Sequence, residues 1–89
     1  MIKIVNAESL HDRTIRLEFS DGTTGDYDMQ RLIVRGTEMV KPLEDKEFFQ
    51  RFFLELGALC WPNGFELSGR GIQHRLREQG KLHPLDHVA

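Results

Sequence analysis

The stretch TIRLEFSDGTTGDYDM, residues 14–29, decides the fold of this chain. Ile15, Leu17 and Phe19 alternate with polar residues, which predicts a half-buried strand over 14–19. The polar residues 20–22 end in glycine and predict a turn. Residues 23–29 then form the returning strand, so we expect an antiparallel hairpin.

The alternation also predicts the register of this hairpin. A two-residue turn would place Leu17 opposite Asp26, although residues that oppose each other share a face of the sheet. A three-residue loop over 20–22 instead places Leu17 opposite Gly25 and Arg16 opposite Asp26 on the outer face. We predict the three-residue loop, because it satisfies both faces and ends on a glycine suited to a left-handed conformation.

The remaining elements are read outward from the hairpin. The predicted elements are a first strand over 2–10, a helical turn over 29–33, a helix over 46–51, a strand over 58–61 and a last helix over 71–79. Residues 52–56 fit a helix and a strand equally well. Ser68 is the expected cap of the last helix, and we expect the tail from Lys81 to be frayed.

Length and composition limit the classes of protein that this chain can represent. The 89 residues suffice for one domain, and net charge is −2. We expect an α+β fold, a small mostly antiparallel sheet with two or three short helices packed on it. Residues 1–67 form the small α+β body and carry 12 acidic against 8 basic residues. Residues 68–89 form a basic helix and tail of the same domain, with 4 basic against 2 acidic residues.

Several chemistries find no support in the sequence. Cys60 is the single cysteine, so no internal disulfide can form, and we expect an inert core thiol in a cytoplasmic protein. No apolar run approaches the length of a membrane span. His83 and His87 have the i, i+4 spacing of metal ligands, but no third ligand is indicated. We expect no catalytic residue, no metal, no cofactor and no enzyme activity.

Three landmarks carry a family resemblance: Leu17 to Gly22, Pro42-Leu43 before a helix, and Trp61-Pro62-Asn63-Gly64 closing a strand. In this order and spacing they resemble the bacterial family known as domain of unknown function number 2442. The resemblance covers roughly residues 3–68 and leaves out the basic segment 68–80. It implies a small α+β domain. Some relatives carry a helix-turn-helix domain, and others are encoded beside a second small protein in a toxin–antitoxin-like arrangement.

Two aromatic segments supply candidate partner-binding residues. Four phenylalanines between 48 and 53 cannot share one helix face, so Phe49 and Phe53 are candidates for a protein or homodimer contact. Alternatively the chain changes from helix to strand near 52 and buries them. Trp61 and Asn63 are candidates for an anchor on a partner, while the structural alternative is a core tryptophan followed by a tight turn.

The last helix supplies the third candidate surface. Arg70, His74 and Arg77 are spaced i, i+4, i+7 and share one side of the helix. Such a side can meet an acidic protein or phosphates, and the alternative is an ordinary solvated face. We therefore expect a protein-interaction module. The alternative is a DNA-linked regulator in which Arg70, Arg75, Arg77 and Lys81 contact phosphates, and a ligand binder or enzyme is the weakest hypothesis.

Overall fold

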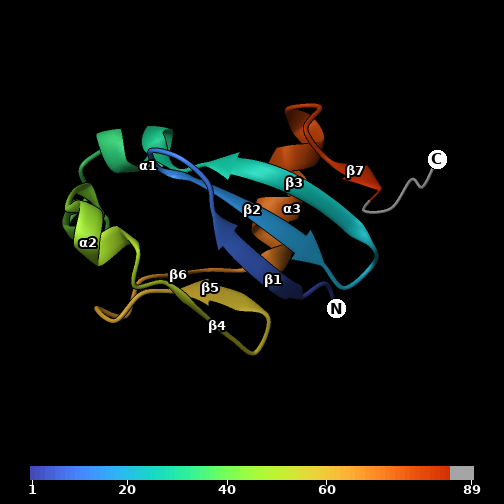
Figure 1. The fold of residues 1–89 in the computed structure, drawn as a ribbon, viewed down its shortest axis with the longest axis horizontal. Helices are drawn as coiled ribbons and strands as arrows, with labels where there is room; N and C mark the ends of the chain where they lie inside the picture. The colour runs from blue at the N-terminus through green and yellow to red at the C-terminus, as the bar shows by residue number, and fades with distance from the viewer. Residues whose placement is uncertain (85–89) are drawn as a thin grey trace.

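The computed structural model describes residues 1–84, in which two small antiparallel sheets pack with short helices (Figure 1). The elements are β1 (Ile4–Ser9), β2 (Thr14–Phe19), β3 (Thr23–Asp28), α1 (Gln30–Val34), the 3₁₀ turn η1 (Lys41–Glu44), α2 (Lys46–Phe49), β4 (Phe53–Glu55), β5 (Ala58–Cys60), β6 (Glu66–Leu67), α3 (Gly69–Glu78) and β7 (His83–Pro84). The strand orders are β1-β2-β3-β7 and β4-β5-β6. The predicted α+β class is confirmed.

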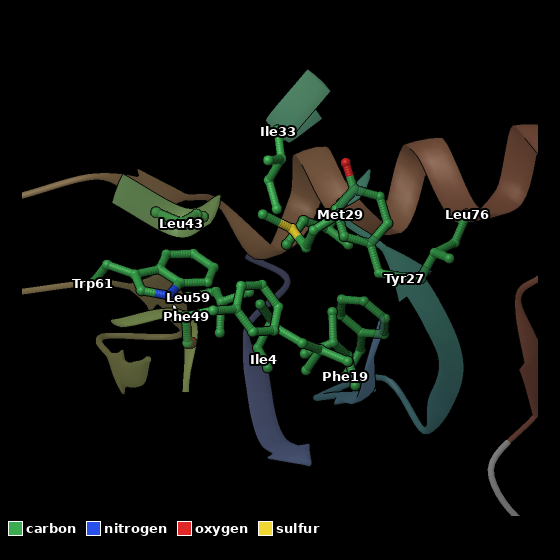
Figure 2. Close-up of a cluster of buried hydrophobic side chains, with 13 residues drawn as sticks. Ile4, Phe19, Tyr27, Met29, Ile33, Leu43, Phe49, Leu59, Trp61 and Leu76 are labelled. Carbon is green, nitrogen blue, oxygen red and sulfur yellow. Dashed lines mark hydrogen bonds between the residues drawn. The ribbon is translucent and has the colours of Figure 1, made fainter. Parts of the chain in front are cut away.

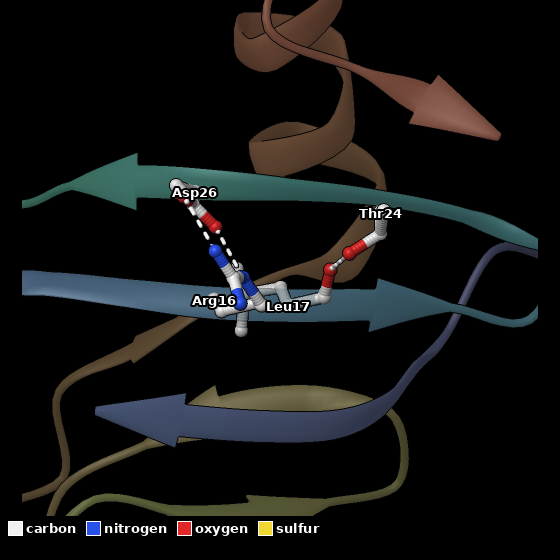
Figure 3. A network of polar contacts seen from close by, with 4 residues as sticks. All are labelled: Arg16, Leu17, Thr24 and Asp26. Atoms are coloured by element: carbon white, nitrogen blue, oxygen red, sulfur yellow. Dashed lines mark hydrogen bonds and ion pairs between the residues drawn. The ribbon is translucent and has the colours of Figure 1, made fainter. Parts of the chain in front are cut away.

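The β2–β3 hairpin has the predicted register. Leu17 lies opposite Gly25 and Arg16 lies opposite Asp26. Gly22 ends the loop with a φ of 86°, a left-handed conformation that glycine adopts without steric cost. On the outer face, the Arg16 Nε donates to Asp26 Oδ1 at 2.9 Å (Figure 3). The Thr24 hydroxyl donates to the Leu17 carbonyl of β2 at 2.7 Å (Figure 3).

Apolar side chains from both sheets and from the helices meet in one core (Figure 2). Ile72 and Leu76 of α3 are buried, and α3 lies across one face of the first sheet (Figure 1). The helix approaches β3 closely because position 25 is a glycine: a Cβ there would lie 2.8 Å from Leu76 Cδ1. Ser68 caps the helix by accepting a hydrogen bond from the Gly71 amide at 3.0 Å, as predicted.

The ambiguous residues 52–56 become a strand. The α2 helix ends at Phe49, and β4 pairs with β5 in an antiparallel hairpin. Leu56 and Gly57 at its tip both have positive φ, 52° and 81°, as a tight two-residue hairpin turn requires. The chain therefore changes from helix to strand immediately after α2.

The expectation of a frayed tail from Lys81 is wrong for the first residues after α3. Gly80 has a φ of 71°, and the Lys81 amide donates to the Leu76 carbonyl at 2.8 Å, which closes the helix end. Leu82 packs against the core, and β7 then pairs antiparallel with Thr23 and Thr24 of β3. The rest of that expectation concerns residues 85–89, which lie outside the described residues.

Candidate binding surface

Phe49 and Trp61 lie in the core, which corrects their prediction as partner-binding residues. They are 0% and 1% exposed, and Trp61 Nε1 donates to the Phe49 carbonyl at 3.0 Å. The Trp61 ring centroid is 5.9 Å from that of Phe49 and 5.7 Å from that of Phe65. Neither side chain can reach a partner, because the change from helix to strand after α2 turns Phe49 inward onto the tryptophan (Figure 2).

Phe53 and Asn63 lie at the surface, but only Phe53 presents an apolar group. Phe53 is 43% exposed on β4, while Phe48 and Phe52 are partly buried. The Asn63 side chain serves the turn after β5: its amide nitrogen donates to the Met39 carbonyl at 3.0 Å, and its oxygen accepts from the Phe65 amide at 3.2 Å. The surface left by the aromatic segments is therefore small.

Arg70, His74 and Arg77 remain together on the exposed side of α3, as predicted from their spacing. All three are exposed, while Ile72 and Leu76 on the opposite side are buried. The His74 Nε2 lies 3.4 Å from a carboxylate oxygen of Glu78, one helical turn further on. The two arginines have no carboxylate within ion-pairing distance in the described part of the chain.

Beside this surface, a hollow of about 500 Å³ opens between α1, the end of β3 and the end of α3. We call it the arginine hollow. Its lining consists of three arginines, two carboxylates and three other residues: Arg31, Arg35, Arg75, Asp28, Glu78, Tyr27, Leu32 and Gln79. The two helices bring together basic residues that lie far apart in the sequence.

Each arginine of the hollow keeps its charge available. Arg75 Nη1 donates to the Tyr27 hydroxyl at 3.1 Å. Tyr27 is 4% exposed, so this contact holds the guanidinium against a buried side chain. Arg31 in α1 and Arg35 at its C-cap are spaced i, i+4, and both are exposed. Among residues 1–84, none of the three forms an ion pair with a carboxylate.

The two carboxylates of the hollow already have partners. Asp28 Oδ1 accepts the Gln30 amide at 2.8 Å in an Asx turn just before α1. Glu78 lies against His74, as described above. The lining thus holds three positive charges against two negative ones. The three arginines form no ion pair within residues 1–84 and can take an external anion.

The arginine hollow was not predicted from the sequence. Arg75 was predicted only as one of four basic residues that could contact phosphates, and Arg31 and Arg35 were given no role. The available signal was the i, i+4 spacing of Arg31 and Arg35, which places two cations on one side of a helical turn. Only the fold, which brings residues of α1 and α3 to one hollow, adds the third arginine.

The outer face of the first sheet is a second candidate, with a broad hollow of about 790 Å³ that Arg16, Asp26, Asp28 and His83 help to line. Arg16 in this hollow already has a partner, because its Nε donates a hydrogen bond to Asp26. That hydrogen bond lowers the pKa of Asp26 below its usual value. No group of three or more metal-ligating side chains forms within residues 1–84. His87, the other half of the predicted histidine pair, lies outside the described residues.

The remaining titratable features are structural. Cys60 is 7% exposed, as expected of a core thiol, and burial raises its pKa. Hydrogen bonds from Thr23 and then Gln73 lower the pKa of Asp21. No helix within residues 1–84 is both long and apolar enough to cross a bilayer.

The fold and this surface define a small α+β domain with a basic helical corner. The chain belongs to the family described as "Protein of unknown function (DUF2442)", whose sequence profile matches residues 4–78. The match confirms the resemblance and corrects its extent, because the family includes α3 and does not end near residue 68. No curated protein and no solved structure matches the chain.

Proposed function

We propose that this protein is a non-enzymatic, cytoplasmic protein-interaction module that docks an acidic segment of a partner onto its basic corner. The basic corner is the arginine hollow together with Arg70, His74 and Arg77 of α3. The observation that supports it is the gathering of three arginines from two helices, none paired with a carboxylate within residues 1–84. Exposed charge of one sign favours a partner of the opposite charge.

An acidic protein suits this corner better than a nucleic acid does. A duplex backbone requires an extended basic surface, and the whole chain is acidic with a net charge of −2. Asp28 and Glu78 line the same hollow and would repel neighbouring phosphates. A folded or extended peptide can instead place single carboxylates beside single arginines. A small protein encoded nearby, as the family resemblance implies, is our first candidate partner.

The alternative function is a DNA-linked regulator, favoured by the exposed row of Arg70, His74 and Arg77. A third arrangement is a homodimer in which acidic residues from the body of one copy, residues 1–67, meet the basic corner of another. These alternatives differ from the proposal in what the corner binds, so one set of binding measurements separates them.

The test is selection of a random phage-displayed peptide library on the wild-type protein and on the double variant R31Q/R35Q. We expect peptides enriched in Asp and Glu that bind the wild type and lose binding to the variant. The matched control is K41Q/K46Q, which removes the same charge from η1 and α2 outside the corner. Peptides without acidic enrichment, or equal loss in the control, would overturn the proposal.

Binding of a labelled DNA duplex, followed by anisotropy over a salt series, tests the alternative. Under the proposal, we expect no binding beyond that of the R70Q/R77Q variant at 150 mM salt. Tight, salt-sensitive binding that this variant abolishes would replace the proposed function with the DNA-linked one.

A further inference from the structure

We propose that the arginine hollow is a carboxylate pocket, in which Tyr27 positions Arg75 and the carboxylate is the group that the hollow recognises. This inference rests on the proposed function and deepens it, because it names the chemical group of the partner that binds. The pocket would take either an acidic side chain or the free carboxylate at the end of a chain, since the two offer the same oxygens.

The first argument is the fixed geometry of Arg75. Its Nη1 donates to the Tyr27 hydroxyl at 3.1 Å. Tyr27 lies on β3 and its side chain is 4% exposed in the hydrophobic core. A guanidinium has five N–H groups in a planar fork, so this contact leaves four of them for other acceptors. The Tyr27 hydroxyl accepts from Arg75 and keeps its own hydrogen for an oxygen of the ligand.

The second argument is the opposite wall. Arg31 of α1 and Arg35 at its C-cap line the hollow, while Arg75 lines it from α3, so an anion in the hollow lies among cations from two elements. Charge-assisted hydrogen bonds from arginine to a carboxylate are shorter and stronger than neutral ones, and a bidentate pair adds geometric specificity. Leu32 supplies apolar surface for a short aliphatic stem.

The third argument selects a carboxylate over a phosphate. Three arginines and two carboxylates leave the lining with one excess positive charge. One carboxylate neutralises this excess. A phosphomonoester carries a charge of about −1.5 to −2 at neutral pH, and would leave the hollow negative beside Asp28 and Glu78.

The pocket is tested by NMR titration of the arginine Nε–Hε resonances with small anions at constant ionic strength. The probes are N-acetylglutamate methylamide for a side-chain carboxylate, N-acetylalanine for a chain-terminal carboxylate, and inorganic phosphate. We expect saturable shifts of Arg31, Arg35 and Arg75 with a carboxylate and weaker binding of phosphate. The tighter of the two carboxylate probes identifies the source. Tighter binding of phosphate, or shifts that never saturate, would overturn the inference.

Variants separate positioning from charge. Y27F keeps all three arginines but removes the acceptor of Arg75, and we expect it to weaken carboxylate binding about three- to tenfold. R75K, which retains the charge and loses the planar fork, should weaken binding in the same way and keeps the test informative if Y27F fails to fold. The matched control is R51K, the same exchange at an exposed arginine outside the basic corner. Weakening by R51K equal to that by R75K would contradict the pocket.

The outcomes of the two tests are distinguishable. Acidic peptides without a saturable carboxylate shift at Arg75 would overturn the pocket and leave the proposed function standing. Carboxylate binding without selection of acidic peptides would overturn the proposed function and leave the pocket standing.

Discussion

Trp61 donates its indole hydrogen to the carbonyl of Phe49 at 3.0 Å, which ties the end of β5 to the end of α2 inside the core. The two rings lie 5.9 Å apart between centroids. The contact satisfies a carbonyl at the helix end, where intrahelical partners run out, and it holds the change from helix to strand that follows. This buried donor therefore links the second sheet to α2.

The first prediction concerns this donor. Trp61→Phe keeps an aromatic ring but leaves the Phe49 carbonyl without its partner, so we expect a loss of about 1–3 kcal/mol in the free energy of unfolding. Urea denaturation measures it. Phe53→Ala, which truncates a residue that is 43% exposed, is the control and should cost clearly less. An equal loss in the two variants would show that the buried hydrogen bond is not important.

The second prediction concerns the close approach of α3 to β3. Gly25→Ala would place a Cβ 2.8 Å from Leu76 Cδ1 and 2.8 Å from the Lys81 carbonyl oxygen. Overpacking of this kind typically costs about 1–3 kcal/mol. Gly71→Ala, whose Cβ would meet the Ser68 hydroxyl oxygen at 2.9 Å, is the comparison in α3. Thermal melts that rank Gly71→Ala as the more harmful change would contradict this account.

The third prediction concerns acid stability. Hydrogen bonds lower the pKa of Asp21 and of Asp26 from their ordinary value of 3.8. The unfolded chain therefore binds more protons than the folded one at acidic pH, and stability rises with pH in that range. This contribution is complete well above pH 3.8 and is lost as the pH falls through the lowered values.

Asp26→Asn removes the contribution of that group, so the difference in stability between variant and wild type should shrink below pH 3.8. Chemical denaturation at pH 3, 4, 5 and 7 measures it. Glu38→Gln is the control, because this exposed carboxylate has no ion pair in the part of the chain that the structure describes. A difference between the Asp26 variant and wild type that stays constant with pH would contradict the assigned cause.

The fourth prediction concerns the mass in solution. The phenylalanine cluster suggested a homodimer, but Phe49 is buried and Phe53 alone of the four is exposed. We expect light scattering across a dilution series to give the monomer mass of 10.4 kDa. A stable dimer that R31Q/R35Q dissociates would instead place a second copy on the basic corner.

The elements that could be predicted from the sequence are those in which one local pattern decides the structure. The register of the β2–β3 hairpin followed from Leu17 and Arg16, because the opposed residues must share a face. The cap at Ser68 followed from the ability of its hydroxyl to bond amides of the first turn. Both features depend on neighbours within a few residues or within one hairpin.

The features that could not be predicted depend on distant contacts. Whether Phe49 or Phe53 faces the core depends on where α2 ends, and Trp61 contacts that end from twelve residues away. The two-residue strand β7 has no periodicity of its own, and its order comes from the closure of α3 at Gly80 and from Leu82. The arginine hollow needs the end of β3, α1 and α3 to line one space, which no local pattern encodes.

The pairing of β7 with β3 has a consequence for the order of folding. During synthesis, β1, β2 and β3 emerge consecutively and can form a meander, yet Thr23 and Thr24 on the outer edge of β3 stay unpaired there until α3 has docked and β7 follows it. An open strand edge is a template for association with other chains. Docking of α3 brings β7 to this edge and so protects the newly made chain from aggregation. Variants that slow the docking of α3 should reduce the yield of native protein more than its final stability.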